Sequence, residues 1–221
     1  MKRILPRPAP PGIRNIVFDI GWVLVRMNYR PLLEFLQAHG AQLADRNAVM
    51  TRIRLEDHET GQLSGLGLLE RLRALTRSQA ASLQEMQAKW LDMFELEPAM
   101  IELAHRLSEH HQVFLLSNIG DLHWAHLARE YRLHAIGHGA LPSYIAGVMK
   151  PHPAIYAEAE RRFALEPGTT VFVDDRPDNI AAARARGWHG IVHQGYPDTL
   201  RRLRSLGVGC PGCKPDALAA V

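Results

Sequence analysis

The chain has 221 residues, of which 47% are hydrophobic and 22% charged, enough for a packed α/β core with an insertion. The net charge is +3, and arginines alternate with glutamates along predicted helices, a pattern of solvated faces rather than of a nucleic-acid surface. No apolar run reaches the roughly 18 residues that span a membrane, and residues 1–12 lack the apolar segment of a signal peptide. We therefore expect a cytoplasmic protein that binds neither nucleic acid nor membrane, with residues 1–12 as a flexible arm.

Short apolar runs predict the strands of a parallel sheet, because strands buried on both faces lack polar alternation. Helical patterns separate the later runs, so the sequence predicts a Rossmann-like α/β core with helices on both faces of the sheet. The expected strands are residues 15–20, 112–116, 170–173 and 190–193, with a weaker one between 135 and 145. The expected helices between them are residues 121–131, 153–164, 179–186 and 198–206.

Residues 27–98 interrupt this alternation. They show helical spacing and no evident strand, which predicts an all-helical cap inserted after the first strand. The core would then consist of residues 13–26 and 99–207. Such a cap can exclude water from a site and select substrates, although a purely structural subdomain is the alternative. The helical patterns are at residues 31–36, 48–58, 67–75 and 79–94.

The two cysteines, Cys210 and Cys213, fall in a C-terminal tail predicted at residues 208–221. A zinc site needs two more ligands, and the sequence has no second cysteine pair. A redox motif normally opens a helix after a strand, whereas this pair follows the last predicted helix. We therefore expect a flexible tail without a metal.

Two of the predicted strands end on aspartate, the first at Asp19 and the later one at Asp174 and Asp175. The carboxyl ends of parallel strands are where open α/β sheets bind their ligands. Carboxylates brought together there repel one another unless a cation or a shared proton lies between them. The pattern therefore predicts a metal site.

Four motifs follow one another along the chain, and their order resembles that of the haloacid dehalogenase (HAD) superfamily. Each string alone is a weak signal, but four in order indicate a phosphatase-type member with a helical cap. The resemblance covers roughly residues 13–207. The strings are VFDIGWVLV at 17–25, LSN at 116–118, KPHPAIY at 150–156 and FVDDRPDNI at 172–180.

The resemblance implies that Asp19 is the nucleophile and forms an aspartyl-phosphate that water then hydrolyses. It implies Mg²⁺ as cofactor, with the Asp19 carboxylate, the Gly21 backbone carbonyl and Asp175 as ligands. Because neighbouring strand residues point to opposite faces, Asp174 is expected behind Asp175, in indirect or water-mediated contact with the metal.

Phosphate binding is implied for the two middle motifs. Lys150 would hold its ammonium against the nucleophile and the phosphoryl group, which makes it part of the catalytic set with Asp19 and Ser117. Ser117 and Asn118 would contribute hydrogen bonds to the phosphoryl oxygens.

The chain departs from the family pattern at Gly21, where phosphatases of this family commonly carry a second aspartate that acts as general acid and base. Glycine retains the carbonyl but cannot transfer protons, a contribution of typically 10²- to 10⁴-fold. The densest titratable cluster in the predicted cap is Asp57, His58 and Glu59, which we consider as a substitute. Trp22 either forms a wall of the substrate pocket or packs beneath the cap.

Three functions remain open. The first is a phosphatase for a small phosphorylated metabolite, such as a sugar phosphate. The second is a metal-independent 2-haloacid dehalogenase, which leaves the Asp174–Asp175 pair without a purpose. The third is a non-catalytic binding protein of the same fold, an alternative that Gly21 keeps open. The sequence indicates neither the substrate nor the oligomeric state.

Overall fold

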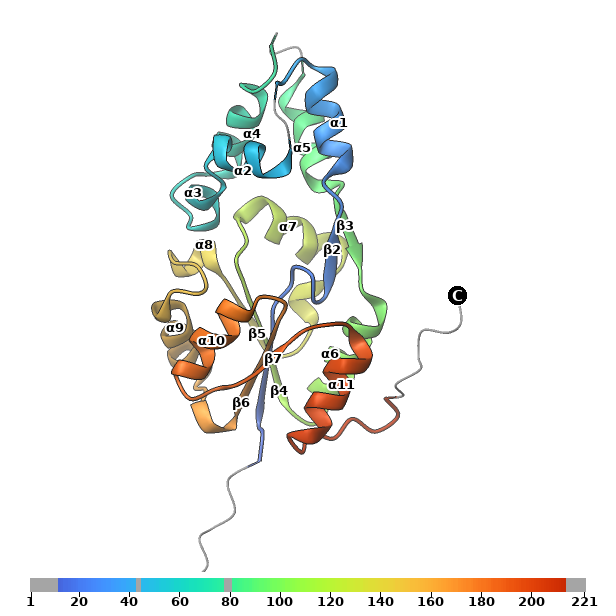
Figure 1. Ribbon diagram of the computed structural model, residues 1–221, viewed down its shortest axis with the longest axis vertical. Helices are drawn as coiled ribbons and strands as arrows, with labels where there is room; N and C mark the ends of the chain where they lie inside the picture. The colour runs from blue at the N-terminus through green and yellow to red at the C-terminus, as the bar shows by residue number, and fades with distance from the viewer. Residues whose placement is uncertain (1–11, 43–44, 78–80, 214–221) are drawn as a thin grey trace, which may run out of the picture.

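The computed structural model describes residues 12–42, 45–77 and 81–213, so the predicted arm lies outside the described residues except for Gly12. An α/β core forms the lower part of Figure 1, and a group of helices stands above it. Within the described ranges, no helix is long and apolar enough to cross a membrane.

The core contains one sheet of five parallel strands in the order β5-β4-β1-β6-β7, which confirms the predicted fold class. The central strand β1 pairs with β4 and β6, and its last residue, Phe18, lies opposite Leu115 and Val173. Three adjacent strands therefore end side by side at the carboxyl end of the sheet, at Asp19, Ser117 and Asp174. The strands are β1 (Asn15–Phe18), β4 (Gln112–Ser117), β5 (Gly139–Pro142), β6 (Thr170–Asp174) and β7 (His189–Val192).

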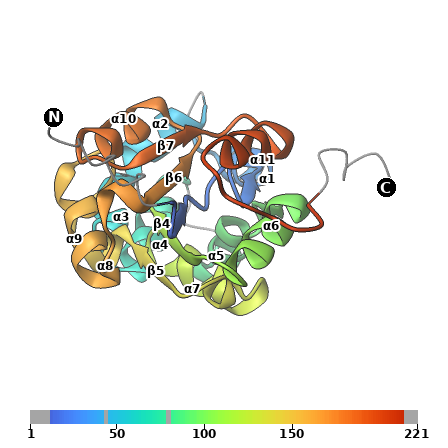
Figure 2. The ribbon, with the colours of Figure 1, turned by 90° about the horizontal axis from the view of Figure 1, so that it is seen from below.

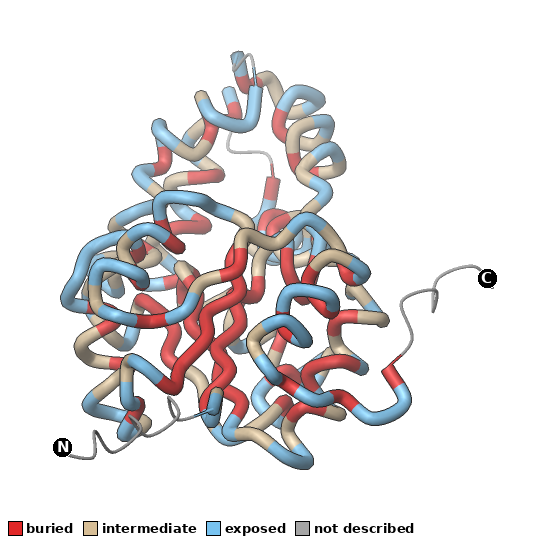
Figure 3. The backbone as a smooth tube through the Cα atoms, turned by 60° about the horizontal axis from the view of Figure 1, so that its bottom comes forward, coloured by how far each residue is buried: buried red, intermediate tan, exposed pale blue. Residues whose placement is uncertain are grey.

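Helices cover both faces of the sheet, as Figure 2 shows from below. Alternate strand residues point to opposite faces, so Ile16 and Phe18 pack with α6, α7 and α11, whereas Val17 packs with α9 and α10. The three central strands β1, β4 and β6 are buried along nearly their whole length, whereas the outer strands β5 and β7 are partly exposed (Figure 3). These helices are α6 (Pro98–Ser108), α7 (Asp121–Glu130), α9 (Pro153–Phe163), α10 (Pro177–Ala185) and α11 (Tyr196–Ser205).

Helix α6 is absent from the helices expected above, although Pro98 in its first turn is a typical start signal. Three shorter elements complete the core: the helical turn η1 (Leu133–Ala135), helix α8 (Ser143–Ala146) and the turn η2 (Pro167–Thr169).

Within the described residues, five helices between Met27 and Phe94 form the group that we call the helical insertion. They bury their own apolar cluster, which includes Leu36, Leu68 and Trp90. The pattern at 48–58 predicted one helix, but the structure has two, because Arg54 adopts a left-handed conformation with φ of 51°. The five are α1 (Arg30–Ala38), α2 (Arg46–Ile53), α3 (Leu55–Glu59), α4 (Gly65–Arg73) and α5 (Leu83–Leu91).

A two-stranded antiparallel ribbon joins the insertion to the core. It consists of β2 (Val25–Met27) and β3 (Phe94–Leu96), with Arg26 opposite Glu95. The expectation of no strand in residues 27–98 is therefore wrong at β3. Three residues are too few for the alternation that identifies a strand in sequence.

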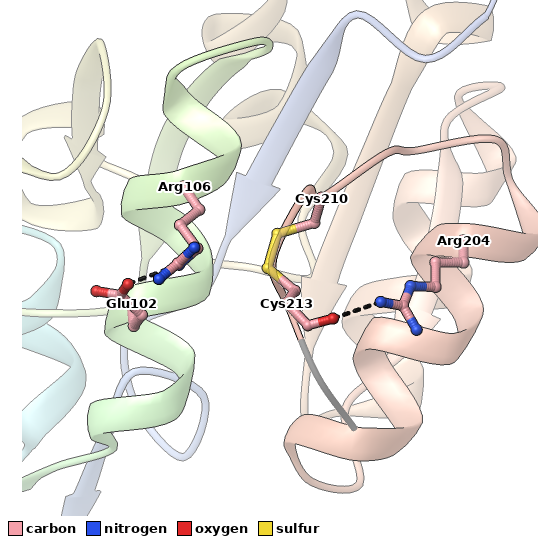
Figure 4. The surroundings of a disulfide bond; sticks show 5 residues. All are labelled: Glu102, Arg106, Arg204, Cys210 and Cys213. Carbon is pink, nitrogen blue, oxygen red and sulfur yellow. Dashed lines mark hydrogen bonds and ion pairs between the residues drawn. A yellow bond between two sulfur atoms is a disulfide. The ribbon is translucent and has the colours of Figure 1, made fainter. Parts of the chain in front are cut away.

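The prediction of a flexible tail is wrong for residues 208–213. Val208, Cys210 and Cys213 are buried and pack into the core cluster that also contains residues of α6 and α11. Cys210 and Cys213 form a disulfide, and the Cys213 carbonyl accepts a hydrogen bond of 2.5 Å from Arg204 (Figure 4). Apolar contact and this hydrogen bond fix a segment whose composition resembles a loop. Residues 214–221 lie outside the described residues.

Candidate active site

The Lys150 ammonium lies at the centre of the site and is buried. Its three protons match three acceptors: Asp19 Oδ1 at 2.9 Å, Asp174 Oδ2 at 2.7 Å and the Leu116 carbonyl at 2.9 Å. Burial alone would lower the pKa of Lys150, but the two carboxylates raise it above its ordinary value. The ammonium is therefore a permanent positive charge beside Asp19.

Asp19 follows β1 directly and is buried at the edge of the sheet. Its Oδ1 accepts a hydrogen bond of 2.7 Å from the Ile20 N–H. Burial raises the pKa of Asp19 to about 6, and Asp174 adds to this rise, while Lys150 and the Ser117 hydroxyl oppose it. The carboxylate predicted to be the nucleophile is thus held by defined partners.

Asp174, predicted to lie behind Asp175, is fully buried at the end of β6. Its Oδ1 accepts from the Arg176 N–H at 2.8 Å, and Asn179 Nδ2 lies within 3.0 Å of both carboxylate oxygens. With Lys150 on Oδ2, the carboxylate is engaged on both oxygens. Asp174 therefore positions Lys150, a role that the sequence pattern does not indicate.

The residues present fit a divalent cation. One carboxylate oxygen each from Asp19, Asp174 and Asp175 lie within 4.8 Å of one another. Burial raises the pKa of Asp175, and the negative charge of Asp174 raises it further, as expected where carboxylates crowd together. A single ammonium does not balance three carboxylates, and oxygen ligands of this kind suit Mg²⁺. Gly21 also lines the cavity, and its carbonyl as a ligand stays a prediction.

Asn118 was predicted to bind phosphate, but both polar atoms of its side-chain amide bond to the Lys150 backbone. Its Nδ2 donates to the Lys150 carbonyl at 2.9 Å, and its Oδ1 accepts from the Lys150 N–H at 2.8 Å. While these bonds hold, the amide is not available to a phosphate. The Asn118 side chain therefore positions the Lys150 loop, and phosphate binding by the backbone at this position stays a prediction. Ser117 is buried beside Asp19, where its hydroxyl is near the nucleophile.

These residues open into a cavity of about 340 Å³ between the core and the helical insertion. Trp22 lines this cavity and is 47% exposed, which favours the wall of the pocket over packing beneath the insertion. Trp90 and Phe94 supply further aromatic surface, and Arg46 and Glu59 supply charged groups.

Several of these lining residues were not predicted. His123 of α7 is buried, and its ring stacks on Trp90 at a centroid distance of 4.5 Å. Burial lowers the pKa of His123 to about 3, so its ring is neutral. Trp90 and His123 belong to elements far apart in the chain, so no local signal could pair them.

Comparison with known proteins agrees with this geometry. Residues 13–187 match the family described as haloacid dehalogenase-like hydrolases. The chain belongs to this family. The resemblance drawn from its four motifs is thereby confirmed.

Two solved HAD structures share the fold. A HAD-family enzyme from Bacteroides thetaiotaomicron, in complex with magnesium, superposes with a TM-score of 0.77 at 23% identity, covering 87% of this chain and 100% of that one. A predicted HAD-like hydrolase from Porphyromonas gingivalis gives a TM-score of 0.73 at 25% identity, covering 88% and 99%.

Among characterised relatives, flavin mononucleotide hydrolase 1 of Arabidopsis thaliana, a chloroplast protein, is 35% identical over 66 residues. The match covers 30% of this HAD chain and only 27% of the length of that relative.

Proposed function

We propose that this HAD-like hydrolase is a cytoplasmic, Mg²⁺-dependent phosphatase that hydrolyses a small phosphorylated metabolite through an aspartyl-phosphate on Asp19. The observation that carries the proposal is the grouping of three carboxylates around one buried ammonium, with Lys150 bonded to Asp19 and Asp174. Phosphoryl transfer requires from the protein mainly the positioning of the reacting groups and positive charge around the transferred oxygens. A metal-independent dehalogenase has no use for the third carboxylate, Asp175.

The residues divide the reaction between them. Asp19 attacks phosphorus, and Lys150 holds Asp19 in place and neutralises negative charge on the phosphoryl group. The Ser117 hydroxyl is available to a phosphoryl oxygen. Mg²⁺ held by Asp19, Asp175 and the Gly21 carbonyl would supply further positive charge at these oxygens. Water then attacks the aspartyl-phosphate and releases inorganic phosphate.

The cavity supports a small substrate with a flat or apolar part. Its volume of about 340 Å³ falls at the lower end of the range for small-molecule sites. Trp22, Trp90 and Phe94 offer aromatic surface, and the Arg46 guanidinium offers a partner for a second anionic group. The sugar phosphate suggested by the sequence remains a candidate, and the name of the Arabidopsis relative adds flavin mononucleotide.

A panel of phosphorylated metabolites tests the proposal, with sugar phosphates, alkyl phosphates and flavin mononucleotide assayed with Mg²⁺ and with EDTA. We expect phosphate release that requires Mg²⁺ and that Asp19→Asn abolishes. Halide release from a 2-haloacid that persists in EDTA would establish the dehalogenase instead. Binding of Mg²⁺ without turnover across the panel would favour the non-catalytic alternative.

A further inference from the structure

Three titratable residues of helix α3, Asp57, His58 and Glu59, face different surroundings. Asp57 forms ion pairs with Arg71 at 2.9 Å and with Arg54 at 3.1 Å. Both arginines belong to the helical insertion, so these ion pairs of Asp57 stabilise contacts within the insertion. Its carboxylate is not directed into the site.

His58 is buried where the insertion meets the core. Its Nδ1 lies 3.1 Å from the Leu63 carbonyl, and its Nε2 lies 3.5 Å from Asp121 Oδ1. A Cβ on Gly120 would come within 2.1 Å of the His58 ring, so the glycine permits this close packing. His58 therefore has a structural position between the two parts of the protein.

Glu59 is the member of this trio that lines the cavity with Asp19 and Lys150. The side chain is partly buried. Among the described residues, its carboxyl has no hydrogen-bond or ion-pair partner, in contrast to Asp57. A carboxyl without a structural partner, on the wall of the cavity that also holds the nucleophile, is available to a bound substrate.

The backbone of Glu59 is fastened to the core. Its carbonyl accepts a hydrogen bond of 2.5 Å from the hydroxyl of Ser143, which is fully buried. The same Ser143 oxygen accepts from the Ile119 N–H at 2.9 Å, in the loop that follows Ser117. One hydroxyl therefore fixes the end of α3 to the segment that carries a phosphate-site residue.

The surroundings keep the Glu59 carboxyl protonated at neutral pH. Burial is the largest cause and raises its pKa to about 8; Glu56 and Asp19 raise it further, while Arg46 and Lys150 lower it. A carboxylic acid with a pKa near the working pH is suited to donate a proton and to take it back.

Position 21 cannot supply that proton. Gly21 has no side chain, and the end of the Met27 side chain lies 3.0 Å from where its Cβ would be. The space that a second aspartate would enter is thus partly filled by an apolar group.

We propose that Glu59, delivered by the helical insertion, is the general acid and base of the reaction in place of an aspartate at position 21. This inference rests on the proposed phosphatase function. As the Asp19 oxygen bonds to phosphorus and the bond to the leaving-group oxygen breaks, Glu59 gives its proton to that oxygen and an alcohol departs. The Glu59 carboxylate then takes a proton from the attacking water. The Asp19–phosphorus bond breaks, phosphate leaves and both carboxyl groups return to their starting states.

The test compares Glu59→Gln with Glu56→Gln on two substrates with Mg²⁺. Glu56 is an exposed carboxylate of the same helix and does not line the active-site cavity, so it is a matched control. One probe is p-nitrophenyl phosphate, whose leaving group departs as a stable anion. The other is an alkyl phosphate, glycerol 3-phosphate, whose leaving group needs a proton. We use kcat/KM because it covers the transfer to Asp19, the step in which the acid donates.

We expect Glu59→Gln to lower kcat/KM about 10²- to 10³-fold for the alkyl phosphate and less than about 10-fold for the aryl phosphate. In the wild type, alkyl phosphate turnover should fall above about pH 8, and this fall should be absent in Glu59→Gln. Glu56→Gln should keep the kcat/KM of the wild type for both probes below neutral pH, where Glu59 stays protonated. Its alkyl phosphate turnover should fall at a somewhat lower pH than in the wild type, because the Glu56 charge that raises the pKa of Glu59 is gone.

Equal losses on the two probes, or an unchanged pH profile, would overturn the role of Glu59 while leaving the phosphatase in place. If the wild type releases phosphate from neither probe, nor from any member of the metabolite panel, the proposed function fails and this inference fails with it. A thermal melt of each variant separates loss of folding from loss of proton transfer.

Discussion

The Lys150 ammonium lies 2.7 Å from Asp174 Oδ2, and both side chains are at least 99% buried. This ion pair aims the remaining protons of Lys150 at Asp19 and at the Leu116 carbonyl. Asp174 in turn is held by the Arg176 N–H and the Asn179 amide. The orientation of the ammonium beside the nucleophile thus depends on a carboxylate that need not contact the substrate.

Asp174→Asn should therefore impair catalysis through Lys150. The amide keeps the shape of the side chain but removes the charge that holds the ammonium, so we expect kcat to fall by about 10²-fold with a smaller change in KM. Stability should fall by about 1–3 kcal/mol, because a buried charge loses one partner. Steady-state kinetics and urea unfolding measure the two effects. Wild-type kinetics in this variant would contradict the positioning role.

Lys150→Met should destabilise the protein and abolish turnover. Removal of the ammonium leaves Asp19 and Asp174 buried without their counter-charge, at a cost of about 3–5 kcal/mol. Added Mg²⁺ should restore part of the thermal stability, since a cation between the carboxylates relieves their repulsion. A melting temperature that does not respond to Mg²⁺ would argue against a metal site at this carboxylate group.

Asp175→Asn should weaken Mg²⁺ binding without disturbing the ion pair of Lys150. Asp175 is half-buried and lines the cavity, so the substitution leaves the buried hydrogen bonds of Asp174 intact. We expect the rise in melting temperature on addition of Mg²⁺ to be reduced, and the Mg²⁺ concentration for half-maximal activity to increase at least 10-fold. An unaltered Mg²⁺ titration would remove Asp175 from the ligand set.

Glu59→Gln should change how stability depends on pH. Folding raises the pKa of Glu59 from 4.5 to about 8, so the folded protein holds a proton that the unfolded chain has released, and its stability declines as pH rises through this interval. Glutamine has no proton to lose and removes this decline. At pH 9 we expect the free energy of unfolding of the variant to exceed that of the wild type by about 1–3 kcal/mol, a range reduced for solvent screening. At pH 4.5 we expect the two free energies to be equal. A difference in melting temperature that is the same at both pH values would contradict the raised pKa.

Gly21→Asp should partly replace Glu59. The group nearest to a Cβ at this position is the flexible end of Met27, which can move aside. In the Glu59→Gln background we expect Gly21→Asp to raise kcat/KM for an alkyl phosphate at least 10-fold. Gly21→Ala in the same background is the control, because it fills the space without adding a titratable group. Equal rates for the two double variants would show that position 21 cannot host the acid.

The sheet and the nucleophile were predictable because their signals are local. A buried strand that ends on a charged residue, as at Asp19 and Asp174, is visible in a few consecutive residues. Parallel topology then brings the two ends together without further information.

The partners of these residues depend on contacts between distant segments. The Asn118 amide fits the Lys150 backbone only after β4 and the Lys150 loop are packed. Glu59 was one of three candidates, and its place in the cavity wall distinguishes it from Asp57 and His58. That place depends on how α3 packs against the core, where Ser143 bonds to the Glu59 carbonyl. The buried Cys210 was misjudged because a loop-like composition does not reveal what it packs against.

The hydrogen bond from Ser143 to the Glu59 carbonyl has a consequence for how the core and the helical insertion can change in evolution. If the proton donor came from the core, the helical insertion could change freely and alter only which molecules enter. Here the same short helix shapes the cavity and carries the acid, so a change in α3 alters both substrate recognition and proton transfer. A movement of the insertion away from the core would separate Asp19 from its proton source, and a molecule too large to be enclosed would meet a nucleophile without its acid.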